Sequence, residues 1–557
     1  MSTTTPALSA FERIKMASDG LRGTLVESLE NEITGNINED DHGLVRFHGM
    51  YLQDDRDRRE ERAAKKLERL YSFMIRLRLA GGYMTPEQWV ALHHIAGEHS
   101  TGVIKITTRQ TIQLHGILKS KVKPTLQAFN EAQLTTLATC GDINRNVCAT
   151  AHPKQSPVHA EVFGYAKEIS DRLMPKTNGY YEIWLDADKL ADKQEEADDL
   201  YQDRYMPRKF KIGLAIPPHN DVDLFTNDLG LIAIVEEGQL KGFNIAVGGG
   251  MSATHGNPDH YPRLASILGF VENDREKVLK AVYEVLTIQR DYGNRADRKL
   301  ARLKYTVDRL GVQWWREELE RRCGFALEAE KPFAFTQRKD DYGWEQSASG
   351  LWYYTLFVEN GRVLDDEKIA LKSALLEVAQ TGKAAFRFTC NQNLTLADIR
   401  PEDKDAVQEI LERYGLVEHT QKASVVRGNA IACVALNTCA LALAESQRYL
   451  PTLISKMEPL LEKHGLQDEE VIIRMTGCPN GCARPFAAEI GFVGTALGKY
   501  NLQIGGDRLG QRLNRLYKES LNEEQILTEL DGFFAAFKTG RTEGETLGDF
   551  LNRNYFN

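Results

Sequence analysis

The sequence predicts a mixed α+β (α/β) fold in which one long unit is used twice around a common centre. Strand-like and helix-like patterns follow one another along the chain. A set of motifs also recurs in the same order in both halves, and the spacing between equivalent residues drifts only from 282 residues (Thr107 to Thr389) to 257 (Phe243 to Tyr500). We therefore predict a pseudo-twofold duplication.

Three pairs of segments show the recurrence. In each pair, polar residues or a strand pattern recur at the same positions. The pairs are 105–110 (KITTRQ) with 387–392 (RFTCNQ), 144–148 (NRNVC) with 429–433 (NAIAC), and 210–213 (FKIG) with 473–476 (IRMT). Basic residues dominate the first copy, whereas the second copy carries two cysteine pairs. The two copies have therefore diverged in the chemical groups that they contribute.

Composition limits the class of protein. A chain of 557 residues is long enough for roughly three or four domains. A formal charge of −9 does not suggest a nucleic-acid-binding protein. Eight cysteines are too few for a disulfide scaffold, and the chain shows neither a secretory signal pattern nor an apolar run long enough to cross a bilayer. We expect a cytoplasmic protein that binds neither nucleic acid nor membrane.

The first half begins with a charge-dense stretch, residues 1–68, which could be a solvated helix, a disordered arm or a docking segment. Residues 72–79 alternate like a strand, and residues 85–99 have the pattern of a capped helix. Residues 105–115 are predicted to form a second strand. The second half repeats this order with a strand at 352–358, a helix at 367–379 and a strand at 386–394.

The predicted strand at 105–115 has an unusual polarity. A period of two places one set of cationic and hydrogen-bonding side chains on the same face. The members of this set are Lys105, Thr107, Arg109, Thr111, Gln113 and His115. A solvated edge strand can have this pattern, and so can a strand that grips a polyanionic ligand.

Four cysteines form the strongest chemical signal. Cys433 and Cys439 make a C-x5-C pair, and Cys478 and Cys482 make a C-x3-C pair. Thiolates suit iron–sulfur clusters, copper(I) or zinc, but zinc knuckles and redox C-x-x-C pairs use other spacings. We predict a cubane iron–sulfur cluster, with buried structural cysteine as the alternative.

The segments that flank the cysteines are also predicted. A helix is expected over 440–461, which would place the first pair of thiols near a helix N-terminus. A strand is expected over 471–476, with the second pair on a Pro-Asn-Gly turn.

Further basic residues belong to the first copy and its tail. Arg145 lies in an Asn-Arg-Asn motif, and Arg208, Lys209 and Lys211 belong to a strand-like segment. A basic run at 294–304 could be a solvated helix face or a ligand contact. The glycine run at 248–250 is not followed by a helical pattern, so we interpret it as a turn and not as a nucleotide-binding loop. If the chain is a redox enzyme, its electrons arrive from another protein.

From about residue 65 onward the chain resembles the siroheme sulfite and nitrite reductase family, most closely the hemoprotein (beta) subunits of assimilatory sulfite reductases. The motifs that carry the resemblance are TTRQTIQLH, NRNV, PRKFK, NQN, ACVALNTC and TGCPNGC. Two positions depart from the family pattern. Asn437 stands where relatives often have proline. Lys105 stands where arginine is common, and lysine keeps the positive charge but lacks the two parallel hydrogen-bond donors of a guanidinium group.

The resemblance implies a [4Fe–4S] cluster held by Cys433, Cys439, Cys478 and Cys482, and a siroheme whose iron shares the Cys482 thiolate. It implies ferredoxin-like halves at 69–135 and 350–415, a siroheme- and substrate-binding domain at 136–349, and a cluster- and siroheme-binding domain at 416–557. Residues 1–68 lie outside the resemblance, and their density of charge makes this N-terminal extension the candidate segment for docking the electron donor.

The resemblance also assigns the basic residues. Those implied to surround the siroheme are Lys105, Thr107, Arg109, Gln113, His115, Arg208, Lys304 and Gln392. Those implied to bind the substrate anion are Arg76, Arg145, Lys209 and Lys211. The arginines would orient the anion, and the lysines could also donate protons.

The implied reaction is the six-electron reduction of sulfite to hydrogen sulfide in sulfate assimilation and cysteine biosynthesis. The implied electron donor is an NADPH-dependent flavoprotein (alpha) subunit, with ferredoxin as the alternative. The rival functions are siroheme nitrite reduction, non-enzymatic electron transfer by an iron–sulfur protein and a zinc-stabilised scaffold. The anion-binding cations argue against a simple carrier, which has no use for them.

Overall fold

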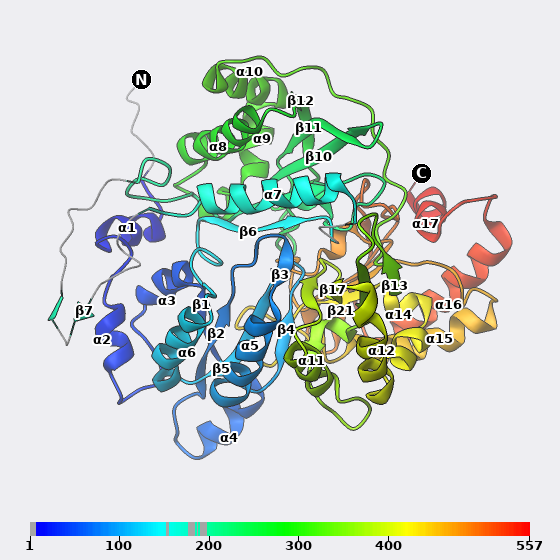
Figure 1. Ribbon diagram of the computed structural model, residues 1–557, viewed down its shortest axis with the longest axis horizontal. Helices are drawn as coiled ribbons and strands as arrows, with labels where there is room; N and C mark the ends of the chain where they lie inside the picture. The colour runs from blue at the N-terminus through cyan, green and yellow to red at the C-terminus, as the bar shows by residue number, and fades with distance from the viewer. Residues whose placement is uncertain (1–6, 152–154, 177–183, 186–187, 190–197, 557) are drawn as a thin grey trace.

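The computed structural model describes residues 7–151, 155–176, 184–185, 188–189 and 198–556 (Figure 1). Its main architecture is two pairs of five-stranded sheets. One pair has the strand orders β1-β2-β5-β4-β15 and β13-β14-β17-β16-β3. The bounds of these strands are β1 Met50–Asp54, β2 Tyr71–Arg76, β3 Tyr83–Met84, β4 Ile104–Ile106, β5 Ile112–Ile117, β13 Gly343–Gln346, β14 Trp352–Leu356, β15 Arg362–Val363, β16 Ala385–Phe388 and β17 Leu394–Ile399.

These two sheets exchange a strand. β15 comes from the second half of the chain but pairs with β4, and β3 comes from the first half but pairs with β16. Helix α5 (Pro86–His99) lies against α11 (Leu371–Gln380), and Trp89 stacks on Phe386 with ring centroids 4.5 Å apart. Helices α6 (Lys119–Glu131) and α12 (Lys404–Arg413) follow in equivalent places. Each half therefore completes the sheet of the other.

The second pair of sheets has the orders β12-β11-β10-β9-β6 and β18-β19-β20-β21-β22. In each sheet, the first three strands of the sequence run parallel to one another. Each of the last two strands runs antiparallel to the strand before it. The strand bounds are β6 Asn144–Ala149, β9 Phe210–Ala215, β10 Leu229–Glu236, β11 Gln239–Val247, β12 Ser266–Glu272, β18 Ala430–Ala432, β19 Ile473–Thr476, β20 Ile490–Ala496, β21 Lys499–Ile504 and β22 Arg515–Leu521. This matching topology confirms the predicted α+β duplication.

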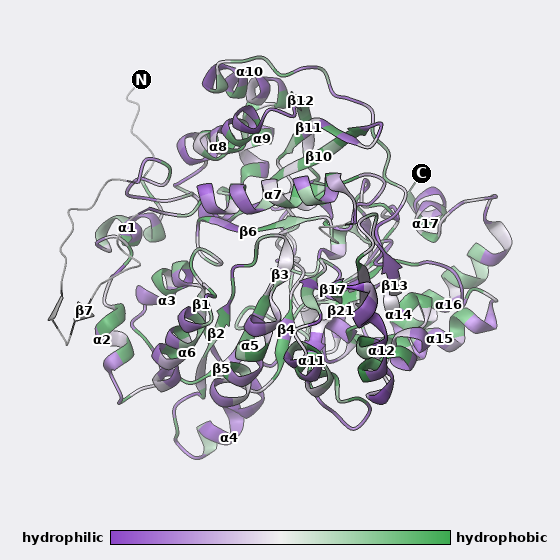
Figure 2. Cartoon of the chain, viewed as in Figure 1, coloured by the Kyte–Doolittle hydropathy of each residue, from purple (hydrophilic) through white to green (hydrophobic). Residues whose placement is uncertain are grey.

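Amphipathic helices complete the cores. α7 (Pro157–Arg172), α8 (Arg275–Tyr292), α9 (Leu303–Leu310) and α10 (Val312–Cys323) belong to the first copy, and α15 (Leu450–Lys463), α16 (Glu523–Gly540) and α17 (Leu547–Phe556) to the second. Helices at the periphery, such as α5, α12 and α16, carry both hydrophobic and hydrophilic segments (Figure 2). Such helices bury one face against a sheet and leave the other in water. No described helix has the length and apolar character needed to span a membrane.

The described part of the N-terminal stretch is folded onto the first half. It contains α1 (Ala10–Ala17), α2 (Leu25–Glu30), α3 (Asp41–Leu44), strand β1 and α4 (Arg59–Ala64). β1 pairs antiparallel with β2, and Lys15 of α1 lies 3.7 Å from the buried carboxylate of Asp142. Residues 7–68 are therefore not a disordered arm.

The prediction of single strands at 105–115 and 386–394 is wrong. Each segment is a hairpin, β4–β5 and β16–β17, with a tight turn in its middle. Gln110 and Gln392 adopt φ values of 50° and 70° in these turns, and Thr107 N–H donates to Thr111 O at 2.8 Å. In the first hairpin, Thr108 and Gln110 interrupt the otherwise apolar face of Ile106, Ile112 and Leu114. Both belong to the turn, which alternation alone does not reveal.

The prediction of a helix over 440–461 is wrong for its first ten residues, because α15 begins only at Leu450. Residues 440–449 form a loop packed on the second cysteine segment, and the N–H groups of Leu443 and Ala444 both donate to Gly477 O. Ala442 and Ala444 are buried in this loop. The apolar pattern reflects loop packing, so the first pair of thiols is not at a helix N-terminus.

Candidate cofactor and anion site

The four predicted cysteines come together from two neighbouring strands. Cys433 follows β18, Cys478 lies just after β19, and these strands pair in parallel. Burial, and then the charge of Cys482, raise the pKa of Cys439 to about 11 and that of Cys478 to about 12. The pKa of Cys433 is raised by the same two causes. Thiols that affect one another in this way lie around one small space.

The surroundings of these thiols fit an iron–sulfur cluster. Thr476 Oγ1 and the Gly477 N–H donate to Cys433 Sγ at 3.4 and 3.3 Å. Ala435, Leu436 and Ala442 pack around Cys433 and Cys439. Hydrogen bonds to sulfur and a dry shell are what tune such clusters. Among the described residues, no three His, Cys, Asp or Glu side chains converge closely enough to hold a single metal ion.

Cys482 differs from the other three cysteines because it is exposed. It interacts electrostatically with the other cysteines and also with Lys209 and Lys211, whose charged forms it favours. Burial, and then Arg109 and Arg302, nevertheless lower the pKa of Lys211 to about 7. Burial, Lys211 and Arg208 lower the pKa of Lys209 well below its ordinary value. The structure thus brings the cysteine set and the predicted lysines together at Cys482.

The two predicted arginines converge on one carbonyl. Arg76 Nη1 and Arg145 Nη1 donate to Thr139 O at 3.2 and 3.3 Å. Arg76 Nη1 also lies 3.0 Å from Cys140 Sγ. Tyr51 of β1 hydrogen-bonds Arg145, and its ring lies under Arg76 at 6.0 Å. Tyr51 lies in the stretch that was treated as an extension, and no motif marked it.

The hairpin residues lie near these groups. Lys105 and Gln113 are cross-strand partners. The Gln113 amide fits best with its nitrogen donating to His115 Nε2 at 3.3 Å and its oxygen accepting from Arg76 Nε at 2.9 Å. Burial, with Lys105 and Arg76, lowers the pKa of His115 to about 3. His115 is therefore neutral and available as a hydrogen-bonding group.

Two of the predicted hairpin residues have structural partners. Thr107 Oγ1 accepts from the Arg109 N–H at 3.1 Å. Arg109 Nη2 donates to Asn146 O and Ile212 O at 2.6 and 2.8 Å, and so ties the turn to the first-copy sheet. Within the described residues its buried Nε has no hydrogen-bond partner. A buried donor of this kind fits a polyanionic ligand.

The remaining predicted siroheme contacts surround the same region. Arg208 lies 3.7 Å from the Asp142 carboxylate, and Gln392 Oε1 accepts from the Ala432 N–H at 3.1 Å, next to Cys433. Lys304 is fully buried and donates to Ser252 O at 2.6 Å and to Tyr261 O. Burial and then Arg302 lower the pKa of Lys304 to about 7.

The glycine run belongs to the site as a loop. The Ala253 N–H donates to Pro479 O at 2.8 Å, so the loop rests on the second cysteine segment. A Cβ on Gly481 would lie 2.4 Å from Met251 O, which explains why glycine stands between Cys478 and Cys482. Residues 248–254 form an irregular loop with a bridge from Gly250 to Arg263, and no helix follows them, in agreement with the prediction that this is not a nucleotide-binding loop.

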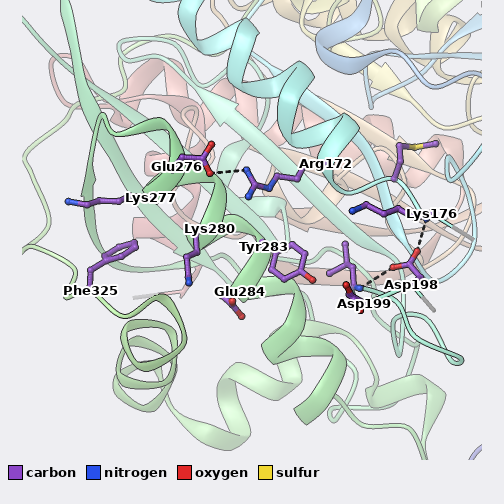
Figure 3. Close-up of a pocket in the computed structure, with 12 residues that line it drawn as sticks. Arg172, Lys176, Asp198, Asp199, Glu276, Lys277, Lys280, Tyr283, Glu284 and Phe325 are labelled. Carbon is purple, nitrogen blue, oxygen red and sulfur yellow. Dashed lines mark hydrogen bonds and ion pairs between the residues drawn. The ribbon is translucent and has the colours of Figure 1, made fainter. Parts of the chain in front are cut away.

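A separate cavity of about 470 Å³ lies between the end of α7 and α8 (Figure 3). Both acidic and basic side chains line it, including an ion pair of 3.3 Å between Arg172 and Glu276. None of the predicted site residues lines this cavity. It is not the cofactor site.

Comparisons with known proteins agree with this geometry. The model for the nitrite/sulfite reductase ferredoxin-like half domain matches residues 66–132 and 345–414. The model for the nitrite and sulphite reductase 4Fe-4S domain matches residues 164–327. The latter range lies in the first copy, whereas the cysteine motifs lie in the second, which shares its topology.

Curated relatives match along nearly the whole chain. Proteins named sulfite reductase [NADPH] hemoprotein beta-component are 62% identical in Leptospira biflexa (97% of each chain covered) and 52% identical in Anoxybacillus flavithermus (98% of this chain and 95% of the relative). The solved structure of the Mycobacterium tuberculosis NirA protein is 26% identical, with a TM-score of 0.78 over 98% of this chain and 96% of that one. The chain belongs to the family of sulfite and nitrite reductases that contains the NADPH sulfite reductase hemoprotein beta-components.

Proposed function

We propose that this chain is the hemoprotein subunit of an assimilatory sulfite reductase and reduces sulfite to hydrogen sulfide with six electrons, for cysteine biosynthesis. One observation carries the proposal. Cys482, the exposed member of four clustered thiols, lies between the other cysteines and the buried cations Lys209 and Lys211. A thiolate in this position can belong to a metal cluster and at the same time border an anion site.

The chain binds a [4Fe–4S] cluster and a siroheme, and we propose that Cys433, Cys439, Cys478 and Cys482 hold the cluster. Cys482 would also hold the siroheme through its iron. When bound, these groups supply the path for the electrons and the centre at which sulfur is reduced. The polypeptide supplies position, charge and protons.

Arg76 and Arg145 orient the substrate anion in this proposal. Both guanidinium groups are held by Thr139 O, so they are fixed before the anion arrives. Arginine stays charged under all ordinary conditions and offers a planar set of donors, which suits an oxyanion. Prior fixing means that little freedom is lost when the anion binds.

Lys209 and Lys211 provide protons as well as charge. Three oxygens must leave sulfite as water, and each departure consumes protons. A buried lysine among other cations holds its proton less tightly than a lysine in water. Both lysines have lowered pKa values because of burial and neighbouring cations. They are therefore placed to act as general acids toward the departing oxygens.

The polyanionic macrocycle accounts for the excess of buried cations. Lys105, Arg208 and Lys304 all have pKa values lowered first by burial. Burying unpaired charge is costly, and carboxylates of the siroheme would offset that cost. With Thr107, Arg109, Gln113, His115 and Gln392, these residues form the proposed siroheme-binding set.

The absorption spectrum of the purified protein tests the proposal, with iron and acid-labile sulfide assayed on the same sample. We expect a Soret-like band, a red-shifted chlorin-type band and the iron of one cubane per chain, together with sulfide production from sulfite. Cluster iron without a macrocycle, in protein made with ample siroheme supply, would contradict the enzymatic proposal. Nitrite reduction at a higher kcat/KM than sulfite reduction would favour the alternative function.

We further propose that electrons come from an NADPH-dependent flavoprotein partner in the cytoplasm, with ferredoxin as the alternative. The relatives' name specifies NADPH, and this chain shows no nucleotide-binding loop at 248–253. The N-terminal stretch supports a docking role. Arg56 Nη1 donates to Ala442 O at 2.5 Å and Asn437 Nδ2 to Asp55 Oδ1 at 2.8 Å, so this stretch lies on the first cysteine loop.

Helix α4 follows that contact, and the residues that flank it, Arg58 and Lys65, are exposed. Reversing Arg58 and Lys65 together (Arg58→Glu, Lys65→Glu) is expected to lower NADPH-driven turnover through the partner flavoprotein about tenfold, because surface charges steer association. Turnover driven by reduced methyl viologen, a small diffusing dye, should be unchanged. Removing residues 1–68 would be a poor test, since β1 is part of the sheet.

A matched control reverses Lys518 and Arg553, which pair with Glu529 and Glu545 on the second copy. This control should leave both assays unchanged. An equal loss in both assays for the α4 variant, or no loss in either, would contradict docking at α4.

A further inference from the structure

The two copies meet in an ion pair between equivalent residues. Asp223 precedes the turn Leu224–Thr226, and Arg484 precedes the turn Pro485–Ala487. Both adopt left-handed backbone angles, with φ 48° for Asp223 and 58° for Arg484. The segments align without a gap as 223–229 (DLFTNDL) and 484–490 (RPFAAEI). The duplication therefore placed a carboxylate in one copy and a guanidinium in the other, and Arg484 Nε contacts Asp223 Oδ2.

The guanidinium of Arg484 also bonds two other equivalent residues. Its Nη1 donates to Thr108 O at 2.8 Å and its Nη2 donates to Cys390 O at 2.9 Å. Thr108 and Cys390 occupy the same position in the turns of the β4–β5 and β16–β17 hairpins. A group that bonds the same atom of both copies lies close to the pseudo-twofold axis. Arg484 thus clamps both hairpin turns at the centre of the molecule.

This clamp reaches Cys482 along two routes. Arg484 is two residues after Cys482 in the chain, and Thr108 Oγ1 donates to Cys482 O at 3.1 Å. The carbonyl of that same Thr108 accepts from Arg484. Arg484, Thr108 and Cys482 therefore form a closed loop of covalent and hydrogen bonds, which restricts where the sulfur can lie.

The centre also holds a buried excess of positive charge. Asp223 accepts from Arg474 at 2.6 Å and from Arg338 in addition to Arg484. All three arginines and Asp223 are at most 5% exposed. The three guanidinium groups outweigh the effect of burial and hold the pKa of Asp223 well below its usual range. One carboxylate against three guanidinium groups leaves an unbalanced positive field behind Cys482.

We propose that Arg484, held by Asp223, is a positioning residue that fixes the Cys482 thiolate and sets the reduction potential of the cofactors attached to it. This inference rests on the proposed function, in which Cys482 is the shared ligand. A charge near a redox centre favours the oxidised or the reduced state according to its sign. Ties to both hairpins keep the sulfur in one place while electrons pass.

The test is a reductive titration of the holoenzyme, followed by absorption, for variants of opposite charge. Arg484→Met removes a positive charge and should shift the midpoint potentials of the cluster and the macrocycle to more negative values. Asp223→Asn removes a negative charge and should shift them to more positive values. A merely structural role predicts no such opposition. Shifts of the same sign in both variants, or no shift in either, would overturn the proposal.

A gentler variant and a control complete the experiment. Thr108→Val removes only the hydroxyl that bonds Cys482 O, carries no charge change and should alter the absorption of the bound macrocycle. Unchanged absorption in this variant would also count against the proposal. Arg387→Met is the matched control, because Arg387 is fully buried but contacts Phe163 and Thr150 O instead of the cysteine loop. The control should lose stability without a shift in potential, and a shift equal to that of Arg484→Met would overturn the assignment.

Failure of this inference is distinguishable from failure of the proposed function. Wild-type protein that lacks siroheme or cluster iron would reject both. Wild-type protein with both cofactors, and variants with unaltered potentials, would reject only the positioning role.

Discussion

Replacing Cys482 by alanine is expected to abolish sulfite reduction, with either the partner flavoprotein or a reduced dye as electron donor. Cys482 is the exposed member of the four clustered cysteines, and its charge is felt by the other thiols and by Lys209 and Lys211. If its sulfur holds both cofactors, its loss would remove one protein ligand from each of them. The effect should therefore fall on kcat more than on the binding of sulfite.

The measurements are the rate of sulfide production, the absorption spectrum and the acid-labile sulfide of the same preparation. Cys323→Ala is the matched control. Cys323 ends α10, is buried, and has a pKa raised to about 12 by burial, so it behaves as a small core residue. The control should keep both cofactors and its activity. A Cys482→Ala protein that reduces sulfite at the rate of the control would remove Cys482 from the proposed ligand set.

Much of this site could be predicted because its chemistry is recorded in residue type and spacing. Cys433, Cys439, Cys478 and Cys482 have few interpretations at their spacing. The cations Arg145 and Lys211 stand in motifs that the two halves or the family share. The duplication was visible because both copies keep polar residues at matched intervals, and the structure confirms it in the strand order of both pairs of sheets.

The errors have a common physical cause. Local patterns do not say whether an alternating segment continues straight or folds back, so the hairpin turns at Gln110 and Gln392 were missed. The apolar loop before Leu450 resembled a helix because it packs on Gly477 and the cysteines. Tyr51 and the Asp223–Arg484 pair depend on contacts between distant segments, and one sequence without its fold carries no sign of them.

Lys211→Arg is expected to keep the binding of sulfite but to lower kcat about a hundredfold, the size of effect typical for loss of a general acid. Arginine preserves the positive charge, so the KM for sulfite should change little. It does not release its proton in the accessible pH range. Lys211 can do so, because burial and the neighbouring Arg109 and Arg302 lower its pKa to about 7. The substitution thus separates the charge of this residue from its proton.

The pH dependence follows from the same group. A lysine acts as an acid only in its protonated form, which is present below its pKa and lost as the pH rises through it. Bound anions raise that pKa, so the wild-type kcat should fall on the alkaline side, at or above about pH 7. The Lys211→Arg enzyme should lack this falling limb.

The comparison needs two further variants. Lys211→Met removes both charge and proton, and should lower kcat and raise the KM for sulfite together. Lys277→Arg makes the same change as Lys211→Arg at an exposed lysine paired with Glu272, and should leave both constants unaltered. Steady-state rates with a reduced dye across the pH range separate these cases. If Lys211→Arg retains the wild-type kcat and its alkaline limb, Lys211 contributes charge alone, and the protons for the departing oxygens must come through another group such as Lys209.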